Sequence, residues 1–302
     1  MKGGRIGAVL GVLAALAAGG RAEATEIAAV FSGSIEPYVI AYEGFADVCP
    51  ANYWKYDLSE KGVSPEWVMD EIARKKPDLV LAIGSSAYRA TLEMGTDLPV
   101  VFTMVLDQGE ESTANIAGAS IRVDPAEEME YVRLLFPQVR SLGVVYDPDR
   151  SGDVVDRARK AAAAEGIDLT ARPATDLSET LRALRELEDQ VDGWWLIPDR
   201  TTLTEETVEY LLVESLRRGK PIVAPSRKYV ERGAHVALVP DYAAIGEEAG
   251  RVALRILGGE RPGLIGIRYA QVSRIVVNDR TSREAGVDLS GSWAKRADRI
   301  GR

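Results

Sequence analysis

Short runs of β-branched and apolar residues alternate along the chain with longer segments in which apolar positions recur at helical spacing. This alternation is typical of parallel sheets whose strands are joined by crossover helices. Strands are expected in two successive series, at 26–31, 53–57, 78–83, 99–103 and 116–121, then at 141–146, 168–172, 192–197, 221–224 and 235–239. Helices are expected between them at 36–48, 65–75, 86–94, 125–136, 152–165, 177–188, 204–218, 226–232 and 242–257.

The two series predict an α/β fold class, with two Rossmann-like doubly wound parallel-sheet lobes and a central cleft. In open sheets of this kind, ligands bind at the carboxyl ends of the strands, beside the switch in strand order. The expected N-terminal lobe comprises 25–122 plus 241–262, and the expected C-terminal lobe comprises 123–240 plus 270–289. Residues 290–302 are polar and basic and are expected to form a mobile tail.

Such lobes require the chain to pass between them three times. The first crossing is expected around helix 125–136 and the turn after it, the second near 239–242, and the third around 260–272. Together these crossings would form a hinge.

The N-terminus has the three-part pattern of a secretory signal peptide. Lys2 and Arg5 precede an uncharged apolar run from Ile6 to Gly20, and Ala22-Glu23-Ala24 supplies an A-x-A cleavage site. The apolar run is shorter than the ~20 residues that a membrane-spanning helix needs, so a membrane anchor is the weaker alternative. We therefore expect a signal peptide at 1–24, a periplasmic protein, and no stable membrane insertion after cleavage.

Composition excludes several function classes. The 302 residues carry a formal net charge of −9 with a pI of about 5.0, which disfavours a nucleic-acid partner. With one cysteine and one histidine, an internal disulfide, a metal cluster or Cys/His catalysis is not expected. Cys49 is interpreted as a small apolar filler and His235 as a packed residue of a strand. No catalytic residue, metal or cofactor is predicted.

Polar residues follow the apolar runs, as in the stretch "LVLAIGSSAYRATLEMG" at 79–95. Each hydroxyl or carboxylate before a helix can be an N-cap, but Gly84 also permits close backbone approach, and helix N-termini favour anions. Ser85 and Ser86 are therefore predicted to bind a ligand carboxylate. Asp107 and Asp199 are the candidate partners of a ligand ammonium group.

Aromatic residues near the same strand ends could line the cleft: Tyr38, Tyr88, Tyr146, Trp195 and Tyr229. Successive residues of a strand point to opposite faces. At most one of Trp194 and Trp195 should therefore reach the cleft.

Several segments resemble one family of ABC transporter substrate-binding proteins, the tryptophan/tyrosine type. They include "KKPDLVLAIGSSA", "VDGWWLIPDRTTLT" and "GKPIVAPSRKYVERGAHVALVPDYAAIGEEAGRVALRILGGERP", and the resemblance covers about residues 26–289. It implies a type I periplasmic-binding-protein fold, closure of two lobes on a small ligand, and delivery to a permease and an ATPase made by other chains.

Carried over by position, the resemblance places the family's ligand-binding loops at Ser32, Ser34, Ser85, Ser86, Asp107, Tyr146, Asp199, Ser226 and Asp241. The chain departs from the family at Leu106-Asp107-Gln108, where Ser-Asp-Pro is usual, and at Arg200, where Pro or Asn is usual. An extra cation at the cleft would favour a more acidic ligand.

The expected function is an exported protein that captures a small zwitterion or carboxylate, with amino acids, including aromatic ones, as the candidate ligands. An exported sensor for a membrane kinase or receptor would use the same closure, and the sequence does not separate the two roles. An amino-acid-processing enzyme is a weaker alternative. A cofactor-independent racemase needs two facing cysteines, a hydrolase would carry G-x-S-x-G, and neither is present.

Overall fold

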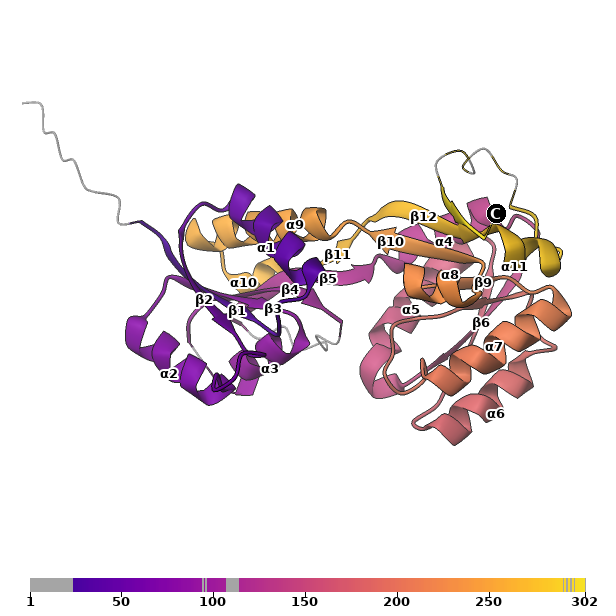
Figure 1. The fold of residues 1–302 in the computed structure, drawn as a ribbon, viewed down its shortest axis with the longest axis horizontal. Helices are drawn as coiled ribbons and strands as arrows, with labels where there is room; N and C mark the ends of the chain where they lie inside the picture. The colour runs from indigo at the N-terminus through magenta and orange to yellow at the C-terminus, as the bar shows by residue number, and fades with distance from the viewer. Residues whose placement is uncertain are drawn as a thin grey trace, which may run out of the picture.

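The first lobe is built on a six-stranded sheet in which every strand is parallel to its neighbours (Figure 1). The computed structural model describes residues 24–301 apart from 94, 96, 107–113, 290, 292, 294 and 296. The strand order is β11-β5-β4-β3-β1-β2. The strands are β1 (Glu26–Phe31), β2 (Asn52–Asp57), β3 (Leu79–Ile83), β4 (Val100–Val105), β5 (Ile116–Val123) and β11 (Ile267–Ala270).

Helices cover both faces of this sheet, which explains why its strands are apolar on both sides. Ile27 and Ala29 of β1 pack under α1 and α9, whereas Ala28 and Val30 face α2 and α3. The helix α9 lies so close to α1 that a Cβ atom on Gly246 would overlap the Ala41 carbonyl. The helices are α1 (Glu36–Val48), α2 (Pro65–Lys75), α3 (Ser85–Glu93), α9 (Tyr242–Leu257) and α10 (Pro262–Ile265).

The second lobe has a seven-stranded sheet in the order β13-β12-β10-β9-β8-β6-β7. Its strands are β6 (Ser141–Tyr146), β7 (Asp168–Pro173), β8 (Gly193–Trp195), β9 (Ile222–Ala224), β10 (Val236–Pro240), β12 (Val272–Asn278) and β13 (Asp298–Ile300). The strand β12 runs antiparallel to β10, because β10 leads toward the junction of the lobes and β12 starts from it. The other pairings are parallel.

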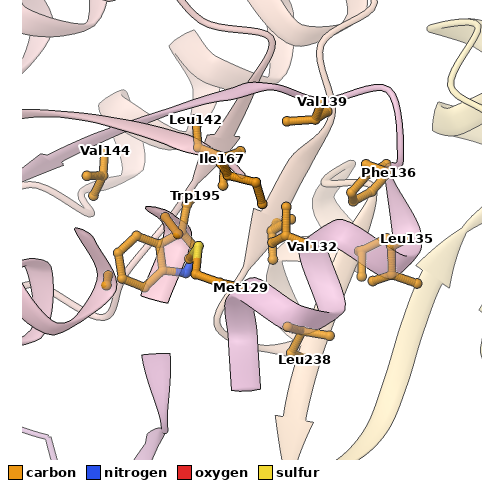
Figure 2. Close-up of a cluster of buried hydrophobic side chains, with 14 of the residues drawn as sticks. Met129, Val132, Leu135, Phe136, Val139, Leu142, Val144, Ile167, Trp195 and Leu238 are labelled. Atoms are coloured by element: carbon orange, nitrogen blue, oxygen red, sulfur yellow. The ribbon is translucent and has the colours of Figure 1, made fainter. Parts of the chain in front are cut away.

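The helices of the second lobe also form two layers. They are α4 (Pro125–Leu135), α5 (Pro148–Ala164), α6 (Leu177–Leu187), α7 (Glu205–Arg218), α8 (Arg227–Arg232) and α11 (Asp279–Glu284). Figure 2 shows the core beneath α4, where Met129 and Val132 lie beside Trp195. Trp194 belongs to a separate cluster, so the two indoles occupy opposite faces of β8, as predicted.

Three short segments join the lobes: 123–125 between β5 and α4, 240–242 between β10 and α9, and 270–272 between β11 and β12. Two of them are tied together. The Asp124 N–H donates to the Ala270 carbonyl at 3.1 Å, and the Val272 N–H donates to the Glu127 carboxylate at 3.0 Å. The expectation that the chain first crosses at helix 125–136 is wrong: it crosses before α4, and α4 packs within the second lobe.

The expectation of a mobile tail is wrong at residues 298–300. They form β13, which pairs in parallel with β12. The Arg299 guanidinium also binds the Asp279 carboxylate at 2.6 Å. The local sequence is polar because this strand forms the edge of the sheet.

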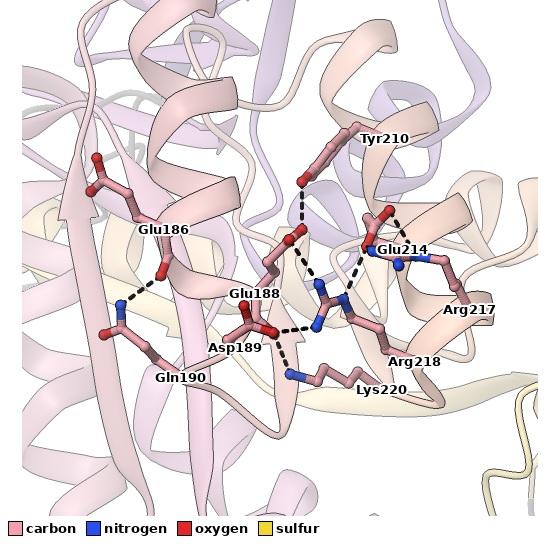
Figure 3. Close-up of polar contacts among 9 residues, drawn as sticks. All are labelled: Glu186, Glu188, Asp189, Gln190, Tyr210, Glu214, Arg217, Arg218 and Lys220. Carbon is pink, nitrogen blue, oxygen red and sulfur yellow. Dashed lines mark hydrogen bonds and ion pairs between the residues drawn. The ribbon is translucent and has the colours of Figure 1, made fainter.

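An ion-pair network fastens the C-terminal ends of α6 and α7 on the second lobe (Figure 3). The Arg218 guanidinium contacts Glu188 at 2.8 Å, Glu214 at 3.1 Å and also Asp189. The Tyr210 hydroxyl donates to Glu188 at 2.7 Å, and burial together with this contact raises the pKa of the phenol. We interpret the network as structural, because each group in it has a partner within the second lobe.

Candidate functional site

A cavity of about 320 Å³ lies where the two lobes meet, within the size range of small-ligand pockets. The first lobe contributes the ends of β4 and β5 and the start of α9. The second lobe contributes α4, α5, α8, the strand β10 and the loops after β8 and β9. The lining residues are Leu106, Ile121, Arg122, Val123, Glu128, Val154, Ile197, Pro198, Asp199, Arg200, Leu203, Pro225, Ser226, Tyr229, Leu238, Pro240 and Tyr242.

Arg122 places a positive charge in this cavity from the end of β5. Its side chain is buried, with only 5% of the residue exposed. Its Nε donates to the Leu106 carbonyl at 2.7 Å, and Nη2 lies 3.5 Å from the Pro198 carbonyl of the other lobe. Arg122 therefore connects the lobes beside the cavity.

The segment that carries Leu106 leaves the sheet through a strained position. Met104 has a φ of 59°, and the register between β4 and β5 shifts at this point. A bulge of this kind changes the direction of the strand and re-aims the side chains that follow. It brings Leu106 to the cavity wall and its carbonyl to Arg122.

Glu128 supplies an acidic group from the first turn of α4, and it is 9% exposed. Burial raises its pKa to about 8, although the Trp195 indole and the charge of Arg122 act in the opposite direction. The nearby carboxylates of Asp124 and Glu127 add to the increase. The carboxyl group is thus mostly protonated at neutral pH.

Asp199 lines the cavity, but its carboxylate is already occupied within the second lobe. Oδ2 accepts from the Asp147 N–H at 2.9 Å and from the Ser151 hydroxyl at 2.8 Å. Oδ1 accepts from the N–H groups of Thr201 at 2.9 Å and Thr202 at 3.3 Å. These four bonds fill the usual acceptor sites of a carboxylate. The geometry therefore argues against the predicted ammonium-binding role of Asp199.

Arg200 and Ser226 also lie in the cavity wall. Arg200 is exposed there. Burial raises the pKa of Tyr38 on α1 of the first lobe, and the charge of Arg200 acts in the opposite direction. Ser226 occupies the N-cap position of α8 without a side-chain capping bond. Tyr229, expected as an aromatic wall, lines the cavity one helical turn further on.

The serines predicted at the strand ends of the first lobe lie outside this cavity in the present arrangement. Ser32 Oγ accepts the Ala87 N–H at the start of α3 at 2.9 Å, and the Ser34 hydroxyl donates to Asp57. Ser85 is partly exposed and Ser86 is exposed at the start of α3.

The glycine in the turn between β3 and α3 is explained by contacts within the first lobe. Gly84 has a φ of 86°, and a Cβ atom there would lie 2.7 Å from the Tyr38 ring and 2.8 Å from Ser32 Oγ. Glycine is required both for this conformation and for this close approach.

Two further predicted residues, Asp241 and Tyr146, lie outside the interlobe cavity. Asp241 caps α9, accepting the N–H groups of Ala243 at 2.9 Å and Ala244 at 3.3 Å, and lines a separate cavity behind the hinge. Tyr146 packs on the core of the second lobe, with the Arg159 guanidinium 5.9 Å from its ring. Neither lines the interlobe cavity, because capping and core packing hold them. Asp107 lies outside the described residues.

Arg122, Glu128 and Tyr242 were missed as site residues. One signal for Glu128 was present in the sequence: it lies one turn before Val132 on the otherwise apolar face of α4. Arg122 likewise interrupts an apolar strand near its carboxyl end. Burying a charge on such a face is costly and points to a site.

A sequence model of a protein family, described as ABC transporter substrate binding protein, matches residues 49–300. The chain belongs to this family. The tyrosine-binding protein of Clostridioides difficile is 23% identical over 224 residues, which make up 71% of this chain and 64% of that protein. The match therefore spans less than two-thirds of the relative's own length.

Solved structures of substrate-binding proteins share the fold. A ligand-free, open substrate-binding protein with adhesive properties from Clostridium difficile has a TM-score of 0.68 and 18% identity, covering 91% of this chain and 99% of its own. An ABC domain in complex with L-Trp from Streptococcus pneumonia has a TM-score of 0.62 and 19% identity, covering 92% and 99%. The type I periplasmic-binding-protein fold that the resemblance implied is thus confirmed. Among the described residues of this substrate-binding protein, no helix has the length and apolar character needed to span a bilayer.

Proposed function

We propose that this substrate-binding protein captures a small zwitterion or carboxylate of the amino-acid type and delivers it to an ABC permease and its ATPase, without chemical change to the ligand. The observation that carries the proposal is the interlobe cavity. It combines apolar walls with the cations Arg122 and Arg200 and with the carboxyl group of Glu128, which becomes the negative charge when it ionises. A zwitterion needs both signs at short range, and a side chain needs the apolar walls.

Aromatic amino acids are the leading ligands within this class. Tyr229 and Tyr242 lie in the walls and offer ring surfaces for stacking. One relative is named for tyrosine binding and one solved relative holds L-Trp. Arg200 adds a cation that would favour a ligand with further negative charge.

Closure of the lobes would complete the site. The three crossings act as the hinge, and rotation about them would bring Ser32, Ser85 and Ser86 toward the second lobe. Their hydroxyls, with the N-terminus of α3, would then face a ligand carboxylate. The ligand stabilises the closed arrangement by its higher affinity for that state.

The same proposal includes export. The pattern at 1–24 is that of a signal peptide, and a periplasmic location follows from its removal. A soluble carrier in that compartment would pass its ligand to the permease.

A ligand panel tests the proposal. The purified protein is unfolded to remove bound ligand, refolded, and scanned for thermal stabilisation by each amino acid. At 100 times its Kd, a ligand should stabilise the protein by about 2.7 kcal/mol. Replacing the exposed Arg200 by Gln should weaken carboxylate binding about tenfold, whereas the matched change Arg182→Gln on α6 should not. Absence of stabilisation by every amino acid would overturn the ligand class.

A further inference from the structure

Glu128 differs from the other acidic residue of the cavity in having no set of donors around it. Asp199 accepts four hydrogen bonds. The Trp195 indole lies near Glu128, but its N–H makes no hydrogen bond of normal geometry within the part of the chain that the structure describes. The Glu128 side chain is nine-tenths buried and lines the cavity. A buried carboxyl group in this setting lacks the partners that would stabilise its charge.

The charges around Glu128 do not replace a partner. Arg122 on β5 is its cationic neighbour, but that guanidinium is directed to the carbonyls of Leu106 and Pro198. On its own helix and cap, Glu127 and Asp124 are acidic and oppose ionisation. The remaining charged or titratable groups of the cavity wall are Asp199, Arg200, Tyr229 and Tyr242.

We infer that Glu128 binds the ammonium group of the ligand as a carboxylate, and that ligand binding expels the proton of Glu128 into solvent. The inference rests on the proposed function and names the residue that distinguishes amino acids from simple carboxylic acids. It replaces Asp199 in that role.

The protonation state of the empty protein supports this coupling. Burial holds the pKa of Glu128 at about 8, so the empty cavity contains a neutral carboxyl group at pH 7. An ammonium group at short range favours the charged form and lowers the pKa. Binding at pH 7 should therefore release close to one proton. The affinity should rise about tenfold per pH unit up to about pH 8 and then level off.

A ligand without an amino group should behave differently. It offers no counter-charge, so Glu128 keeps its proton and no release occurs. Its affinity should be constant below about pH 8 and should fall above it, because the ionised carboxylate would then repel the ligand.

Calorimetric titration in buffers of different ionisation enthalpy measures the released protons directly. The probes are L-tyrosine and L-tryptophan, each paired with its desamino analogue, 3-(4-hydroxyphenyl)propionate or indole-3-propionate. Proton release with the amino acids and none with the analogues is the expected result. Binding of the amino acids without proton release would overturn the inference and leave the proposed function intact. No binding of any probe would overturn the aromatic ligand class, and the inference with it.

Two matched variants test whether the released proton comes from Glu128. Glu128→Gln mimics the neutral form in shape and charge, so the fold should persist, as checked by circular dichroism. It should abolish proton release and weaken amino-acid binding at pH 8 at least tenfold, while the analogues change less than twofold. Glu130→Gln removes the same charge from an exposed position of α4 and should leave every value unchanged. Unaltered proton release in Glu128→Gln would contradict the assignment.

Discussion

The Ser151 hydroxyl donates a hydrogen bond of 2.8 Å to Oδ2 of Asp199, and this contact holds α5 against the loop that follows β8. The same carboxylate fixes the backbone of Asp147, Thr201 and Thr202. Asp199 thus shapes the cavity wall on which Arg200 sits.

Replacement of Asp199 should therefore reduce the stability of the fold more than it reduces ligand affinity. Asp199→Ala leaves four donors without their acceptor, three of them on buried residues, and we expect a loss of about 3–5 kcal/mol in the free energy of unfolding. Asp149→Ala, at an exposed position on the first turn of α5, should cost less than about 1 kcal/mol. Urea denaturation measures both. Equal losses in the two variants would show that the hydrogen bonds of Asp199 contribute little.

Gly84 offers a second test, of packing at the turn before α3. Gly84→Ala should destabilise the protein by roughly 3 kcal/mol, because an alanine there is strained at positive φ and also overlaps Tyr38. Gly62 has a similar φ of 90°, and nothing lies within 4 Å of the position that a Cβ atom would take there. Gly62→Ala should cost only about 1 kcal/mol by urea denaturation. Equal losses of stability in the two variants would contradict the close approach of Gly84 to Tyr38.

His235 should make the protein sensitive to acid. The side chain is fully buried, Nδ1 accepts the Ile222 N–H at 3.2 Å, and Nε2 has no partner among the described residues. Burial lowers its pKa from 6.5 to about 4. As the pH falls from 6.5 to 4, the unfolded chain takes up a proton that the folded chain does not. Stability should therefore fall by up to roughly 3 kcal/mol over this window.

The matched variant is His235→Asn, which keeps an acceptor near Nδ1 and cannot titrate. Denaturation midpoints measured from pH 7 to pH 4 should decline less in this variant than in the wild type. If the midpoints decline equally with pH in both proteins, His235 is not the cause of the acid sensitivity.

The two lobes also meet through a cation–π contact. The Arg157 guanidinium on α5 lies 4.9 Å from the ring of Tyr269 on β11. In the proposed closure, rotation about the three crossings would change the separation of these residues, so the contact would stabilise the present arrangement. Removing it with Arg157→Met should favour closure and raise the apparent ligand affinity up to about fivefold, equivalent to about 1 kcal/mol.

Arg159→Met is the control for this experiment, because the ring that Arg159 faces, Tyr146, is in the same lobe. Calorimetric titration with L-tyrosine compares the two variants. A weaker affinity in Arg157→Met than in the control would indicate that the contact belongs to the closed state instead.

Most of the sheet and helix pattern could be predicted from the sequence because the strands are buried on both faces. The bounds of β1, β6, α1, α2 and α9 agree with the apolar pattern residue for residue. The strands β11, β12 and β13 were not predicted. They lie at or near the sheet edges, where polar residues replace the apolar run, as in "IRYA" of β11.

The site was harder to predict, because the cavity depends on how the lobes meet. Polar residues at strand ends looked alike in the sequence, yet Ser34 and Asp241 bind partners in their own lobe, whereas Ser226 reaches the cavity. Arg122 and Glu128 lie only six positions apart, at the end of β5 and the start of α4, and each interrupts an apolar face. The sequence does not show, however, that both side chains line a cavity between the lobes.

The packing of α9 against α1 has a consequence for biosynthesis. A nascent chain that has reached only the end of β5 lacks the helix that shields Ala41 and Phe45, and it also lacks the outer strand β11. Its amino-terminal half would thus leave the ribosome with an uncovered apolar layer and an unpaired edge. The first lobe can complete its fold only after residue 270 has emerged, so residues 26–123 stay incompletely folded until residues 125–240 of the second lobe have been made.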